Sequence, residues 1–328
     1  MGKWLGRMLV LLAAMVVGLW VFGPYEPVDL AAEFDSRKFG EGVQVYFETV
    51  EAEFDDLTPG VEKRVVWRPD KYERRTAYSI LYMHGFSATS EEIRPVPDRM
   101  AEALDANLVY MRLRGHGRGS AAMTEASAGD WMYNMAEGMA AARATGDEVI
   151  VLSTSTGGTL ASAAAVDPDL SEDVAAMIFV SPNFAINDPL AYLLTWPGAR
   201  YWGPPAMGGG ERCFEPRNQA QQTYWTTCYP WAALMPMAAL VKAVAAMDFS
   251  QAMVPALFVF SDDDAVVRSD ATRDIAGRWG GPIEIQNVNL GPEDDPAAHV
   301  IAGDILSPGQ TDRVVADILA WLQSQGIE

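Results

Sequence analysis

The run from Glu148 to Ala161, EVIVLSTSTGGTLA, limits the possible folds of this 328-residue chain more than any other stretch. Its first half is short, apolar and β-branched, which is typical of a buried strand. The strand pattern ends at a Ser-x-Ser-x-Gly turn, and the small residues up to Ala165 then indicate a helix. A serine on such a tight strand-to-helix turn has its hydroxyl raised above the sheet. We therefore expect Ser155 to be a nucleophile on a strand–turn–helix unit.

The first position of this turn departs from the usual Gly-x-Ser-x-Gly pattern, because Ser153 stands where glycine is common. Small residues are needed on both sides of the nucleophile, since the strand and helix backbones come close there. Serine is small enough to keep that approach. The alternative is that Ser155 lies in an ordinary loop between a strand and a helix, and the choice depends on partners elsewhere in the chain.

A nucleophilic serine needs a base within hydrogen-bond reach and an acid that fixes the tautomer of that base. On a turn of this kind the acid and then the base follow the serine along the chain. His299 is the only histidine after Ser155 and follows the last predicted strand, so we expect it to be the base. The alternative is a surface or capping histidine.

The acid is expected after the strand predicted at residues 255–260. Asp262, Asp263 and Asp264 all follow that strand, and their position alone leaves the three open. The alternative role for each is that of a turn or helix-cap aspartate.

Backbone N–H groups are needed to stabilise the charge that develops on a reacting carbonyl oxygen. The N–H of Thr156 follows the nucleophile at a helix N-terminus, where the helix dipole also favours negative charge. The second donor is expected in the loop after an early strand, where Phe86 follows His84 and Gly85. We expect His84 to brace that loop, and we interpret residues 114–119, RGHGRG, as a turn because the third glycine of a nucleotide-binding loop is missing.

The composition excludes some classes of partner. Apolar residues make up 49% of the chain, which indicates a globular protein with a substantial core. The formal net charge is -20. Because phosphate binding needs a basic surface, we expect no nucleic-acid partner and an acidic, solvated surface instead.

The N-terminus differs from the rest of the chain. Lys3 and Arg7 precede a run of uncharged, mostly apolar residues at 8–22, and acidic residues begin at Glu26. This order is typical of a signal peptide or an uncleaved signal anchor over residues 1–23. No small-x-small cleavage site follows the apolar run, so we favour an anchor with its basic end in the cytoplasm. The globular part is then exported, periplasmic or membrane-anchored outside the cytoplasm.

The chain has two cysteines, Cys213 and Cys228. An exported protein permits a disulfide between them, and two free buried thiols are the alternative. No spacing of cysteines and histidines suggests a metal site.

Strand and helix patterns alternate along most of the chain. Residues 44–54 and 61–67 alternate in polarity and predict an antiparallel pair. Asp130 is expected to cap a helix that ends before Gly146. Alternating elements predict a mostly parallel sheet with helices on both faces. Further strands are expected at residues 78–83, 108–113, 149–152, 174–180, 255–260 and 283–288, and further helices at residues 91–104, 272–279 and 311–323.

The order HGF at 84–86, RGHG at 114–117, STSTGG at 153–158, DAVV at 264–267 and a final His299 resembles the α/β-hydrolase superfamily. The resemblance is strongest to its bacterial carboxylesterase, monoacylglycerol-lipase and lysophospholipase-like branch. In that branch the acid usually opens an Asp-x-Val-Val stretch, which favours Asp264. The resemblance implies an α/β-hydrolase fold and no cofactor.

In such enzymes an insertion forms a helical cap over the active site, and residues 186–250 hold no clear strand. The resemblance therefore implies a linker at residues 24–42, a hydrolase core at 43–185 and 251–328, and a cap at 186–250. Few acids in the cap argue against a substrate amine. The cap residues that are candidates for lining an apolar acyl pocket are Trp225, Tyr229, Trp231 and Met235. The alternative, favoured for any single one of them, is that it only packs the cap against the core.

The expected activity is that of a serine carboxylester hydrolase acting on a neutral, apolar acyl ester through an acyl-enzyme intermediate. A lysophospholipase or a thioesterase would use the same Ser-His-Asp triad. A peptidase and a non-catalytic binding protein with a hydrolase fold are further alternatives.

Overall fold

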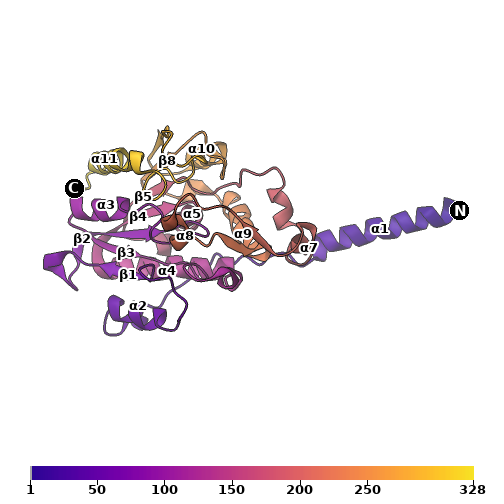
Figure 1. The fold of residues 1–328 in the computed structure, drawn as a ribbon, viewed down its shortest axis with the longest axis horizontal. Helices are drawn as coiled ribbons and strands as arrows, with labels where there is room; N and C mark the ends of the chain where they lie inside the picture. Colours follow the sequence, from indigo (N-terminus) through magenta and orange to yellow (C-terminus); the bar gives the residue numbers. More distant parts are fainter. Residues whose placement is uncertain (1) are drawn as a thin grey trace.

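A computed structural model describes residues 2–328 of the chain. Over those residues the main sheet has seven strands in the order β1-β3-β2-β4-β5-β8-β9, and β1 alone is antiparallel to its neighbour, β3 (Figure 1). The prediction of a mostly parallel α/β sheet is confirmed. The strands are β1 (Arg64–Val66), β2 (Thr76–Met83), β3 (Asn107–Tyr110), β4 (Gly146–Thr154), β5 (Val174–Val180), β8 (Ala256–Phe260) and β9 (Ile283–Asn287).

Helices cover both faces of the sheet, because alternate residues of the central strands point to opposite sides. Ile150 and Leu152 belong to one buried cluster, which α3 and α11 cover, whereas Val149 and Val151 belong to the other, which α4 and α5 cover. Both clusters are apolar, as expected for parallel strands buried on two faces. The helices of the core are α2 (Val43–Glu51), α3 (Val96–Ala103), α4 (Ala128–Thr145), α5 (Thr156–Val166), α6 (Pro168–Ser171), α10 (Ser269–Arg278) and α11 (Pro308–Ser324).

The strand predicted at residues 44–54 is wrong, because this segment forms helix α2. Val43, Phe47 and Glu51 recur every four residues and are all buried, which is the period of a helix face. The carboxylate of Glu51 accepts hydrogen bonds from Arg112 at 2.6 and 2.8 Å, and both side chains are buried. An internal salt bridge thus fixes α2 against the sheet. Of the predicted pair only the three residues of β1 form a strand.

Several other boundaries also differ from the prediction. Ser127, rather than Asp130, caps α4, and Asp130 completes a capping box three residues later. The helix expected from residue 91 begins only at Val96, where Pro95 is the N-cap. The strand expected to reach residue 113 ends at Tyr110.

The inserted segment contains a strand pair that was not predicted. Strands β6 (Glu211–Cys213) and β7 (Cys228–Pro230) are antiparallel and a disulfide joins Cys213 to Cys228. Strands of three residues give too short an alternation to detect in a sequence. The rest of the segment is helical, with η4 (Ala191–Thr195), α7 (Ala199–Ala206), α8 (Gln219–Tyr224), η5 (Trp231–Ala233), α9 (Leu234–Ala245) and η6 (Phe249–Gln251). The domain boundaries at residues 185 and 250 stay a prediction.

Helix α1 (Gly2–Phe22) projects away from the rest of the molecule as a single rod, with α7 at its base (Figure 1). Its segment Lys3–Phe22 has a mean hydropathy of 2.2, is not buried, and is long and apolar enough to cross a membrane. The segment after α1 is packed against the globular part, since Val28, Leu30 and Phe34 contact the buried cluster beside α4.

Candidate active site

Ser155 lies between β4 and α5, at the carboxyl end of the central strand. Its φ of 50° is unfavourable for a non-glycine residue, and such strain is typical of functional sites. The turn is tight, because a Cβ atom on Gly157 would lie 2.1 Å from the carbonyl oxygen of Met83. Glycine is therefore required there. The Ser155 side chain makes no capping bond to α5, so its hydroxyl is available to other partners.

Ser153, the unusual first residue of the turn, is fully buried. Its hydroxyl donates a hydrogen bond of 3.1 Å to the carbonyl oxygen of Ile178 on β5. A buried hydroxyl with a partner is well tolerated. The departure from glycine therefore does not disturb the turn.

The structure brings Ser155, His299 and Asp264 together. The Nε2 atom of His299 lies 3.1 Å from Oγ of Ser155, and its Nδ1 atom lies 2.8 Å from Oδ2 of Asp264. All three side chains are buried. They come from the ends of β4, β8 and β9, which meet at one edge of the parallel sheet.

Asp264 is the only one of the three candidate aspartates that contacts His299. Its second oxygen, Oδ1, accepts hydrogen bonds from the N–H groups of Val266 and Val267 at 2.8 and 2.9 Å. These bonds hold the carboxylate toward the histidine. Asp262 is exposed and pairs with Arg273 at 2.7 Å, and Asp263 is exposed as well.

The charge of Asp264 sets the protonation of His299. Burial is the largest single effect on the pKa of His299 and lowers it, but the charge and hydrogen bond of Asp264 together with the charges of Glu92 and Asp295 outweigh burial, so the pKa is raised above its usual 6.5. The loop that carries His299 is held by a further acid, because the carboxylate of Asp295 accepts the N–H groups of His299 and Val300 at 3.1 and 2.9 Å.

The backbone N–H groups of Phe86 and Thr156 donate no hydrogen bond to another group within residues 2–328. The loop that carries Phe86 lies against Ser155, since a Cβ atom on Gly85 would lie 3.0 Å from Cβ of Ser155. His84 is fully buried, and its Nε2 atom accepts the N–H of Leu113 at 3.1 Å. His84 thus links this loop to the end of the neighbouring strand, in line with a bracing role.

Glu92 is a buried acid beside the site that was not predicted from the sequence. Its carboxylate accepts the N–H of Gly85 at 2.7 Å and the hydroxyl of Tyr82 at 3.4 Å. Burial raises the pKa of Glu92 to about 7, despite the hydrogen bond from Gly85. In the sequence Glu91 and Glu92 resemble an ordinary acidic start of a helix, and only the folded chain buries one of them.

The cap residues predicted to contact substrate are mainly packed inside the protein. Trp225, Tyr229 and Met235 are buried, and the Tyr229 ring lies 5.2 Å from that of Phe86, edge to face. Trp231 is half-buried beside Arg212. As substrate contacts these four residues stay a prediction.

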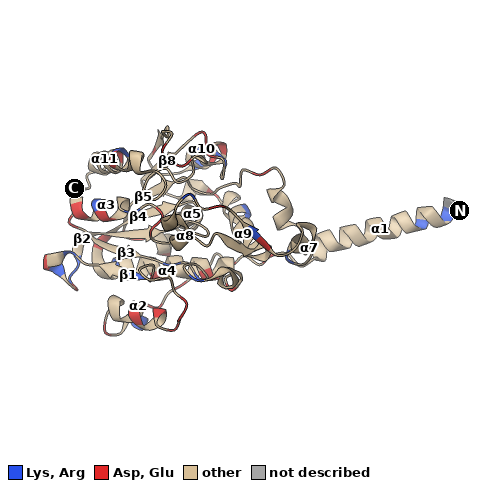
Figure 2. Cartoon of the chain, viewed as in Figure 1, with Lys and Arg blue, Asp and Glu red and all other residues tan. Residues whose placement is uncertain are grey.

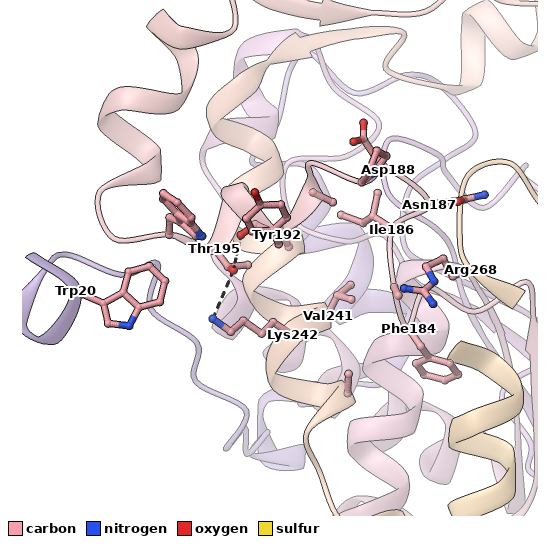
Figure 3. Close-up of a pocket in the computed structure, with 16 residues that line it drawn as sticks. Trp20, Phe184, Ile186, Asn187, Asp188, Tyr192, Thr195, Val241, Lys242 and Arg268 are labelled. Carbon is pink, nitrogen blue, oxygen red and sulfur yellow. Dashed lines mark hydrogen bonds between the residues drawn. The ribbon is translucent and has the colours of Figure 1, made fainter. Parts of the chain in front are cut away.

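A cavity with a volume of about 770 Å³ lies between the end of α1, η4 and α9 (Figure 3). None of the four predicted cap residues lines it. Asn187, in its wall, donates a hydrogen bond of 3.0 Å to the carbonyl oxygen of Asp264, so the cavity adjoins the loop that carries the acid.

One group of side chains in the described part of the chain has metal-like spacing, namely Glu211, Cys213 and Cys228. The disulfide removes both thiolates as ligands, so this group does not fit a metal ion.

Comparison with known proteins identifies the family of the chain. A model of the alpha/beta hydrolase family matches residues 80–302, which is more than half of the chain. The chain therefore belongs to the alpha/beta hydrolase family. A search of curated proteins finds no match.

Solved structures share the fold at low identity. A structure of the metagenome-derived lipolytic enzymes LipS and LipT has a TM-score of 0.64 and 18% identity, covering 82% of this chain and 99% of that one. A soluble monoglyceride lipase variant from Saccharomyces cerevisiae, bound to a substrate analogue, has a TM-score of 0.57 and 11% identity. The match covers 80% of this chain and 91% of that one. Est1E from Butyrivibrio proteoclasticus, with ferulic acid bound, has a TM-score of 0.52 and 17% identity. The match covers 83% of this chain and 98% of that one.

Proposed function

We propose that this protein is a serine carboxylester hydrolase with Ser155, His299 and Asp264 as its catalytic triad. The observation that carries the proposal is the continuous hydrogen-bonded path from Oγ of Ser155 through both nitrogens of His299 to Asp264. A neutral histidine at this distance is able to take the serine proton as general base.

In this mechanism Oγ of Ser155 attacks the ester carbonyl while Nε2 of His299 takes its proton. The N–H groups of Phe86 and Thr156 stabilise the oxyanion that forms. His299 then protonates the leaving alcohol, and an acyl-enzyme remains on Ser155. Water, activated by the same histidine, cleaves this ester and regenerates the enzyme.

A neutral, apolar acyl ester is the substrate class we favour. The cap supplies few charged groups, and the cavity beside the acid loop is lined mainly by apolar and aromatic side chains. The lipolytic enzymes and the monoglyceride lipase named above have the same fold. A lysophospholipase or a thioesterase with the same triad is the second candidate, and a panel of lysophospholipid, thioester and amide substrates separates these activities.

We also propose that α1 anchors the enzyme in a membrane with the globular part outside the cytoplasm. Lys3 and Arg7 are the two cations of α1, and both stand at its start, which favours a cytoplasmic N-terminus.

The test of the triad is hydrolysis of short and medium p-nitrophenyl esters by the wild type and two serine variants. Ser155→Ala removes the nucleophile, and we expect kcat to fall by roughly 10³-fold or more. Ser153→Ala is the matched control two residues away, and we expect its activity to stay within about tenfold of the wild type because it leaves the triad intact. Full activity of Ser155→Ala would refute the assignment.

A further inference from the structure

A cluster of exposed aromatic and aliphatic side chains surrounds the base of α1. Tyr192 on η4 is 57% exposed, Trp196 is 40% exposed and Tyr201 on α7 is 71% exposed. Tyr25 and Leu190 complete this group, which we call the aromatic collar. Large side chains exposed together in this way mark an interaction surface.

Three contacts fix the collar to the last turn of α1 and the residues that follow. The Trp196 ring lies 5.6 Å from that of Trp20, edge to face. Beyond the helix, the N–H of Gly198 donates to the carbonyl oxygen of Pro24 at 2.7 Å, and Nε of Arg200 donates to Glu26 at 2.9 Å. The collar therefore lies level with the C-terminal end of α1.

The length of α1 sets the depth of that level in a membrane. Its 21 residues span roughly 31 Å at about 1.5 Å per residue, close to the thickness of about 30 Å of a bilayer's hydrocarbon core. When α1 spans the core, Phe22 reaches its outer boundary. The side chains of the collar then meet the headgroup region, where tyrosine and tryptophan are enriched in membrane proteins.

The charge around the collar fits the same surface. Residues 189–210 contain no aspartate or glutamate and one cation, Arg200, in a chain with 44 acidic residues. Figure 2 shows α1 without acidic residues and the acids gathered mainly on the rest of the molecule. Asp188 is the exposed acid next to Leu190, and a face with so few carboxylates limits repulsion from anionic lipids.

We propose that the aromatic collar docks on the outer headgroup layer of the phospholipid bilayer that α1 spans. Trp20, Tyr192 and Trp196 also line the cavity of about 770 Å³ (Figure 3), so docking brings that cavity against the bilayer surface. The inference rests on the membrane anchor proposed above and not on the reaction, and it is tested without an activity measurement.

The test places a fluorescent NBD label on single cysteines introduced into the full-length protein. Tyr192→Cys and Tyr201→Cys label the collar, and the native cysteines take no label because they form a disulfide. Tyr72→Cys is the control, because Tyr72 is 62% exposed and precedes β2, at the edge of the sheet opposite the active site. Each labelled protein is reconstituted in phosphatidylcholine vesicles with and without a headgroup-attached nitroxide lipid.

We expect the nitroxide lipid to quench the labels at positions 192 and 201 severalfold more than the label at position 72. Thermal unfolding at the wild-type temperature confirms that each labelled variant is folded, which is expected because all three sites are exposed. Equal quenching at the three positions overturns the proposal. The proposal is also overturned if the collar labels in detergent become more shielded from solvent as the protein concentration rises. In that case a second copy of the chain covers the collar.

Discussion

Asp264 orients His299 and influences its protonation. Replacing Asp264 therefore tests which of the three aspartates after β8 acts as the acid of the triad. In Asp264→Asn the attraction that raises the pKa of His299 is lost and burial dominates, so that pKa falls. A general base must be neutral, so the acidic limb of kcat/KM lies above pH 6.5 in the wild type and moves to lower pH in the variant. We expect kcat to fall on the order of 10³- to 10⁴-fold.

The matched control for that experiment is Asp262→Asn, which removes an exposed carboxylate two residues away that pairs with Arg273. Its pH profile and its kcat are expected to stay close to those of the wild type. A larger loss of kcat in Asp262→Asn than in Asp264→Asn would show that Asp264 is not the acid of the triad.

Glu92 makes stability depend on pH. Its pKa of about 7 in the folded protein exceeds its ordinary value of 4.5, so between these values the folded state holds a proton that the unfolded state has released. The free energy of unfolding therefore falls as pH rises from about 4.5 to 7, by about 3 kcal/mol from this group. Urea unfolding of the wild type and Glu92→Gln at pH 5 and pH 7.5 measures this contribution.

In Glu92→Gln the loss of stability across that pH range is expected to be smaller, because glutamine does not titrate and still accepts the N–H of Gly85. An identical pH dependence in the two proteins would show that Glu92 is ionised in the folded state throughout.

At the scale of elements, the turn between β4 and α5 depends on the absence of a side chain at Gly157. Alanine there would place Cβ 2.1 Å from the carbonyl oxygen of Met83, so the turn or the end of β2 has to move. We expect Gly157→Ala to destabilise the fold by about 3 kcal/mol and to lower activity, since the displaced turn carries Ser155.

Gly277→Ala is the control, because Gly277 lies on the exposed side of α10 with nothing within 4 Å of the added Cβ. Alanine in a helix is favoured over glycine, so this variant is expected to be more stable by about 0.5–1 kcal/mol. Thermal and urea unfolding compare the two. A Gly157→Ala variant as stable as the wild type would contradict the close approach of Gly157 to Met83.

The elements also show where sequence patterns stop being informative. The strand before Ser155 was predictable because continuous β-branched residues suit a strand buried on both faces. The segment at residues 44–54 was mistaken for a strand because Val43, Val45 and Phe47 fit a period of two as well as a helix. The burial of every fourth residue and the buried pair of Glu51 with Arg112, far apart in sequence, favour the helix.

The candidate site also has one part that the sequence predicts and another that it does not. The order of Ser155, the aspartates and His299 follows from chain position, because the ends of parallel strands meet at one sheet edge. The choice among three adjacent aspartates depends on the direction of each side chain in a loop, which spacing does not contain. The burial of Glu92 and the packing of Trp225 and Met235 depend on contacts between distant segments, and no local pattern encodes them.

For the whole molecule, the anchor role that we propose for α1 concerns where the enzyme works. If it is an uncleaved anchor, the protein in the membrane fraction keeps its full mass of 35.7 kDa and resists extraction by alkaline carbonate. We expect this result because the apolar run is followed by Pro24 rather than a small-residue cleavage site. A soluble exported product shortened by the first residues would contradict the anchor and identify a signal peptide.

The central claim is that Ser155 is the nucleophile of a hydrolase, and covalent labelling tests it most directly. The wild-type protein is treated with a fluorophosphonate probe, digested and mapped by mass spectrometry. We expect one adduct, on Ser155, that disappears in Ser155→Ala and persists in Ser153→Ala. An adduct on any other residue, or no adduct on the folded wild type, would contradict it.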